Sequence, residues 1–175
     1  SRYSFELKYE DEKELIAVTD KSSGESFIIP EETFVDESYS IMSIYPTENY
    51  LYYMKGRNSG VSIYRIKLSD MTREEIIKSS DTADKSILGL TFSWSDTENR
   101  FSAVRLFTDE KNIYLIDKNG MVFVLNPFAE KITDCTCIIE ESVLGGCIFD
   151  GKAIYYIDED GVQKMYNVVN KTFRI

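Results

Sequence analysis

Carboxylates are the residues of this sequence best placed for acid–base chemistry, because 30 of its 175 residues are Asp or Glu and none is His. Without His, Ser-His-acid catalysis, Cys-His catalysis and His-containing zinc sites are excluded within this chain. A glycosidase mechanism needs two carboxylates about 5 to 9 Å apart. Adjacent acidic residues such as Glu31 and Glu32, Glu74 and Glu75, and Glu140 and Glu141 could form such a couple. With so many acids, solvated surface is the favoured interpretation, and no residue is assigned a catalytic role.

The three cysteines are the next candidates. Cys135 and Cys137 lie two apart in DCTCIIE, so on a strand both side chains point to one face. A thiolate metal site would need a fourth Cys or His besides these two and Cys147, and the sequence holds none. We therefore expect free structural thiols and no metal. A disulfide between Cys147 and either of the others is the alternative, and it requires Cα atoms within about 7 Å.

Two acidic segments begin like calcium-binding loops. They are Asp-Lys-Asn-Gly at 117–120 and Asp-Glu-Asp-Gly at 158–161. Both lack the Asp-x-Asp-x-Asp-Gly spacing and the later Glu that make such loops specific. Gly and Asn tolerate the positive φ of tight turns, so both segments predict hairpin turns. We expect no cofactor.

An aromatic insertion offers the best candidate for ligand binding. Residues 79–101 read SSDTADKSILGLTFSWSDTENRF and contain Phe92 and the sole tryptophan, Trp94. Insertions on rigid scaffolds tend to carry function, and these rings could stack on a sugar or a peptide. Phe92 and Trp94 are therefore the predicted ligand-binding residues. In the alternative interpretation, the segment is a strand whose aromatic side chains fill the core or cover an edge.

Four stretches share one pattern: a short apolar run, a turn with Gly, and a second run. The first runs start at Leu15, Leu51, Ile113 and Ile154. Each stretch predicts a β-hairpin. The starts are about 40 residues apart once the insertion is set aside, which is typical of propeller blades with four strands. Further strands are expected before and after the hairpins, at 39–45, 73–78, 102–108, 142–149 and 171–175.

The first runs also predict burial. IYLI at 113–116 and IYYI at 154–157 do not alternate apolar with polar residues, as a strand with one solvated face would. Sheets stacked around an axis bury both faces of their middle strands and produce such runs. The sequence therefore predicts an all-β, propeller-like fold with about four four-stranded antiparallel blades. Part of a larger propeller and a β-sandwich are the alternatives.

These hairpins resemble a known group of repeats. IYYIDEDG, IYLIDKNG and LYYMKGRNSGVSIYRIKL are similar to the blades of YWTD-type, TolB-like and quinoprotein-type propellers. They are most similar to bacterial extracytoplasmic β-propeller repeat proteins, often catalogued as domains of unknown function. The resemblance covers about 12–78 and 102–175 and implies blades, with no catalytic residue to transfer. The Trp of the YWTD pattern is replaced by Ala17, Tyr53, Leu115 and Tyr156.

One repeat domain is therefore expected over residues 1–175. Its units are predicted at about 3–36, 39–78, 102–134 and 142–175, with the insertion at about 79–101. The first fifteen residues contain no apolar signal core, so we expect any targeting segment to lie outside this sequence.

The overall negative charge limits the classes of partner that this protein is expected to bind. A formal charge of -10 repels nucleic acids and anionic lipids. The sequence also contains no run of about 18 apolar residues, the length that a membrane-crossing helix needs. The resulting prediction is a non-catalytic binding module of an extracytoplasmic or cell-surface protein, with a protein or glycan ligand. The alternatives are a carboxylate-dependent glycoside-active enzyme and a structural spacer domain.

Overall fold

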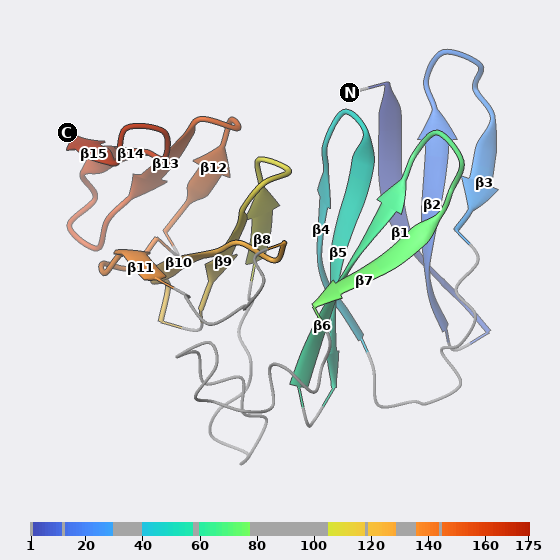
Figure 1. Ribbon diagram of the computed structural model, residues 1–175, viewed down its shortest axis with the longest axis horizontal. Helices are drawn as coiled ribbons and strands as arrows, with labels where there is room; N and C mark the ends of the chain where they lie inside the picture. Colours follow the sequence, from blue (N-terminus) through green and yellow to red (C-terminus); the bar gives the residue numbers. More distant parts are fainter. Residues whose placement is uncertain are drawn as a thin grey trace.

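The computed structural model consists of four antiparallel β-sheets, each built from strands consecutive in the chain. It describes residues 2–11, 13–29, 40–57, 60–77, 105–117, 119–128, 136–143 and 145–175. Figure 1 shows the sheets following one another in chain order, from the blue first sheet to the red fourth sheet. Strands form here because the apolar runs are rich in Ile, Leu, Val and Tyr and end at Gly-containing turns. The predicted all-β, propeller-like fold is confirmed.

The strands of each sheet pair in sequence order. The first sheet contains β1 (Tyr3–Glu10), β2 (Lys13–Asp20) and β3 (Ser26–Ile28). The second contains β4 (Ser40–Pro46), β5 (Tyr50–Arg57), β6 (Gly60–Lys67) and β7 (Arg73–Ile77). The third contains β8 (Arg105–Thr108), β9 (Ile113–Ile116), β10 (Val122–Leu125) and β11 (Thr136–Ile139). The fourth contains β12 (Cys147–Phe149), β13 (Ala153–Ile157), β14 (Gln163–Asn167) and β15 (Thr172–Arg174).

The acidic segments form the predicted hairpin turns. The Asp117 carboxylate accepts hydrogen bonds from the backbone N–H groups of Asn119 and Met121, and Gly120 follows with φ of 84°. The Asp158 carboxylate accepts the equivalent bonds from Asp160 and Val162. These oxygens therefore stabilise turns, which explains both acidic segments without a calcium ion.

The core lies between consecutive sheets. Three clusters of buried apolar side chains join the first sheet to the second, the second to the third, and the third to the fourth. In β5, Leu51 and Tyr53 pack toward the first sheet, whereas Tyr52 and Met54 pack toward the third. This two-sided burial accounts for the non-alternating sequence of the middle strands, and each such side chain contributes about 1.5–3 kcal/mol to folding.

The leading strands of the last three sheets converge. Ser43 of β4 accepts a hydrogen bond through Oγ from the Leu106 backbone N–H of β8 at 3.1 Å. The rings of Tyr45, Phe107 and Phe149 come one from each of β4, β8 and β12, and their centroids lie 5.6–6.3 Å apart. These ring contacts hold β4, β8 and β12 close together, as expected for sheets arranged about a common centre.

The stack is an arc in the described part of the chain. Among those residues, no core cluster joins the fourth sheet to the first. They also include no helix that could cross a lipid bilayer. Each end of the arc therefore presents the outer face of a sheet, one from the first sheet and one from the fourth.

Candidate functional site

The repeat gives each residue of an apolar first run a fixed direction. Counted from Leu15, Leu51, Ile113 and Ile154, the second and fourth residues of each run share one side of the middle strand, because side chains alternate along a strand. In the first three sheets, this side faces the next sheet. In the first three sheets these residues are 0–3% exposed. They are Ile16 and Val18, Tyr52 and Met54, and Tyr114 and Ile116. Their counterparts in the fourth sheet, Tyr155 and Ile157, are 43% and 38% exposed.

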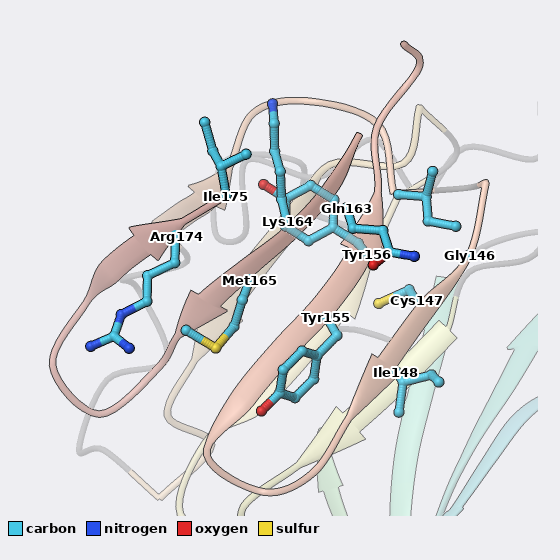
Figure 2. A pocket seen from close by; sticks show the side chains of 11 residues that line it. Gly146, Cys147, Ile148, Tyr155, Tyr156, Gln163, Lys164, Met165, Arg174 and Ile175 are labelled. Carbon is cyan, nitrogen blue, oxygen red and sulfur yellow. The ribbon is translucent and has the colours of Figure 1, made fainter. Parts of the chain in front are cut away.

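These two residues belong to a surface that we call the apolar end face. The strand register aligns Ile148 of β12, Tyr155 of β13, Met165 of β14 and Arg174 of β15 in one row across the fourth sheet. Figure 2 shows this row of four side chains. By the strand register, Ile157 and Gln163 form the next pair on the same face. The surface forms a shallow concavity of about 610 Å³, and Ile148 at its edge is 69% exposed.

The Tyr155 ring is held by the turn that precedes its strand. Its hydroxyl donates a hydrogen bond to Oδ2 of Asp150 at 3.1 Å, and this carboxylate raises the pKa of Tyr155. Oδ1 of Asp150 accepts the backbone N–H groups of Lys152 and Ala153, which together lower the pKa of Asp150. The ring is thus fixed as an exposed, flat apolar surface with an anionic group at its rim.

The opposite side of the fourth sheet carries an ionic cluster, the clasp, which joins it to the third sheet. Glu141, just after β11, accepts hydrogen bonds from the Tyr156 hydroxyl and from Nζ of Lys164. Lys164 also pairs with Asp158 at 2.9 Å. The hydrogen bonds from Lys164 lower the pKa of both Glu141 and Asp158, so these carboxylates stay ionised.

The clasp does not provide the acid of a glycosidase couple, because a general acid needs a raised carboxyl pKa. Glu74 and Glu75 point to opposite faces of their sheet, because they are adjacent residues of strand β7. Glu74 accepts hydrogen bonds from Arg65, while Glu75 accepts one from the Tyr64 hydroxyl. Glu31 and Glu32 lie outside the described residues.

The described cysteines are free thiols. Cys137 and Cys147 are both partly buried and form no disulfide with each other. Burial raises the pKa of Cys147 to about 11 and also raises the pKa of Cys137. Cys135 lies outside the described residues, which contain no cluster of three or more Cys, Asp or Glu suited to a metal ion.

The two predicted ligand-binding residues, Phe92 and Trp94, lie outside the described residues. The structure instead draws attention to Ile148, Tyr155 and Ile157, which sequence reasoning did not select as a site. The run IYYI at 154–157, which includes Tyr155, was predicted there to be buried on both faces. Nothing in the run IYYI itself distinguishes Tyr155 from Tyr52 and Tyr114, because the difference lies in the neighbouring sheet and not in the strand.

Comparisons with known proteins bear on the fold. No protein-family model matches the sequence, and no curated protein matches it. Among solved structures, the crystal structure of the tricorn protease, a β-propeller-containing protein, is similar, with a TM-score of 0.51 and 11% sequence identity. The alignment covers 99% of this chain and 17% of that chain. At this identity the likeness supports the propeller-like arrangement of sheets and carries nothing about function.

Proposed function

We propose that this chain is a non-catalytic protein-binding module that uses the apolar end face as its contact surface. The observation that carries the proposal is the exposure of Tyr155 and Ile157 at repeat positions that are fully buried in the other three sheets. The extracytoplasmic or cell-surface location expected from the sequence resemblance is part of the proposal.

The chemistry of the face favours a protein ligand over a glycan. Interface cores are enriched in aromatic residues, Met and Arg, which supply large contact areas. The row presents Ile148, Tyr155, Met165 and Arg174, with polar groups at its rim. A glycan site would need several inward-pointing polar groups beside its stacking ring. A spacer domain would not need an exposed apolar row.

Phe92 and Trp94 remain a second candidate contact. If they bind the same ligand, Trp94→Ala weakens binding without changing the denaturant midpoint of the chain. If they belong to the core, the same substitution lowers that midpoint.

Site-specific photo-crosslinking in the native host tests the proposed surface. A photoreactive amino acid replaces Ile148 in one chain and Ile28, on the outer face of the first sheet, in the control. We expect a discrete crosslinked product from position 148, identified by mass spectrometry, and none from position 28. Equal yields from both positions, or none from position 148, would overturn the proposal.

A further inference from the structure

We infer that the partner of the apolar end face is the same face of a second copy of this chain, packed sheet to sheet. The inference rests on the proposed function and names its partner. Three observations carry it: the way in which equivalent faces are covered inside the chain, the composition of the outer face of the first sheet, and the positions of the charged groups on the apolar end face.

The chain itself shows what an end face of this kind packs against. Three times, the second and fourth residues of an apolar first run are covered by another antiparallel sheet that presents Ile, Leu or Tyr. Tyr155 and Ile157 repeat these positions with side chains of the same type as Tyr114 and Ile116. The complement of the apolar end face is therefore an apolar sheet surface.

The first sheet of the same chain offers a poorer complement. Its outer face, which we call the polar end face, includes Leu15, Ala17 and Ile28, but it surrounds them with Ser4, Glu6, Lys8, Thr19 and Ser26. Closing the arc onto this face would bury charged side chains against Ile148 and Tyr155, which costs several kcal/mol per unpaired ion. A second copy, by contrast, presents an apolar row of the right kind.

A two-fold axis parallel to the strands makes the row self-complementary. It places β12 of one copy opposite β15 of the other, so that Tyr155 lies against Met165 of the second copy. Arg174, the only cation of the row, then lies beside Ile148 of the second copy, within a side chain's reach of Asp150 of that copy. Two copies thus exchange two Asp–Arg pairs around an apolar centre, as an isologous interface requires.

Charge and area set the strength of the association. Each copy carries a formal charge of -10, so the copies repel one another and salt should strengthen the pairing. Strands of three to five residues, spaced about 4.8 Å apart, span a patch about 15 Å on a side. This is small beside the roughly 800 Å² per partner of a standard interface. We therefore expect a Kd on the order of tens of micromolar.

Sedimentation velocity on matched variants tests the inference. Ile157 and Ile28 are the same residue type, are 38% and 39% exposed, and lie at opposite ends of the arc. Across about 1 to about 300 μM, we expect wild type and Ile28→Arg to shift from monomer to dimer. Ile157→Arg should associate at least about tenfold more weakly. Ile148→Ser, at the most exposed position of the row, is the second variant if Ile157→Arg does not fold, as judged by circular dichroism.

The outcomes separate this inference from the proposed function. A wild-type chain that stays monomeric overturns the inference, as does equal weakening by Ile157→Arg and Ile28→Arg. If the chain stays monomeric but crosslinks from position 148 to another protein, the proposed function stands and only the second copy is excluded. If neither association nor crosslinking occurs, both proposals fail.

Discussion

The two ends of the arc differ in what surrounds residues of equal exposure. Ile28 and Ile157 are exposed to the same extent. On the polar end face, Ile28 pairs with Ala17 across the sheet, and the next pair along the strands is Ser26 with Thr19, whose hydroxyls share a hydrogen bond of 2.7 Å. Ile157 lies beside Tyr155 in a continuous apolar surface. The neighbourhood, and not the exposed fraction, distinguishes a solvated end from a contact surface.

The difference teaches that the two end sheets follow different rules. In repeat architectures each unit contacts its neighbours, and terminal units need a polar outer face to remain in solution. The first sheet meets this requirement through the charged residues of β1. The fourth sheet carries the side chains of an interior unit on a face that no described residue covers. Among the described sheets, the fourth therefore presents a face suited to contact, and the first presents a face with more charged and hydroxyl side chains.

The largest expected effect compares one repeat position in two sheets. Tyr52 is fully buried between the second and third sheets, whereas Tyr155 lies on the apolar end face. Tyr52→Ala should lower the free energy of unfolding by about 3–5 kcal/mol, as for other large core side chains. Tyr155→Ala should lower it by less than about 1 kcal/mol. Urea unfolding at a concentration where the chain is monomeric measures both, and similar losses would show that Tyr155 is a core residue.

Much of this architecture could be predicted from the sequence because hairpins are local. The apolar runs and Gly turns predicted β2–β3, β5–β6, β9–β10 and β13–β14, and the structure contains all four. β1 was missed although Tyr3, Phe5, Leu7 and Tyr9 alternate with polar residues, the signal of a strand with one solvated face. β11 was missed because TCII at 136–139 is short and has no Gly turn beside it.

The apolar end face could not be predicted, for a physical reason. The run IYYI reports that its side chains suit burial on both faces, and β9 meets that expectation with four buried residues. In β13 the same pattern leaves Tyr155 and Ile157 exposed, because burial depends on a neighbouring sheet that the strand's own sequence does not encode. The sequence thus predicts that a face is suited to contact, and the structure shows which such face no described residue covers.

A second, smaller effect concerns the ion pairs of the two end sheets. The clasp crosses from the third sheet to the fourth, whereas Asp20 pairs with Arg2 inside the first sheet. Lys164→Met should therefore speed amide hydrogen exchange across β12–β15 by loosening the fourth sheet as a unit. Arg2→Met, the matched control, should speed exchange near β1 alone. Faster exchange in the first sheet after Lys164→Met would contradict this assignment.

The clasp also predicts a pH dependence with a definite sign. The pKa values of Glu141 and Asp158 are lowered in the folded state. Their contribution to the free energy of unfolding is therefore fully present above about pH 4, the pKa of such carboxyl groups in the unfolded chain. It is lost as the pH falls through the folded values. The wild-type urea midpoint should thus fall more between about pH 7 and about pH 3 than the midpoint of Lys164→Met. Equal falls would show that the clasp contributes nothing.

Making the polar end resemble the apolar end should create a second contact surface. Glu6 and Lys8 are exposed on β1 and carry opposite charges, so Glu6→Ile with Lys8→Val leaves the net charge unchanged while adding β-branched apolar groups. We expect species larger than a dimer in sedimentation velocity, because each copy then has two apolar ends. Adding Ile157→Arg should limit this variant to dimers. A variant that associates no further than wild type would show that apolar exposure alone does not make an end face adhesive.

The smallest expected effect concerns the single cation of the row. Arg174→Gln removes the attraction to Asp150 of a second copy but keeps most of the side-chain area, and exposed ion pairs contribute about 0–1 kcal/mol. Dimerisation should therefore weaken by at most about fivefold, and the loss should shrink at high salt because the pair is screened. Lys8→Gln removes one positive charge from the polar end face instead. It should change the dimer affinity only through the more negative net charge of each copy. A strengthened dimer after Arg174→Gln would mean that this cation faces another cation across the interface, which requires a two-fold axis perpendicular to the strands instead of parallel to them.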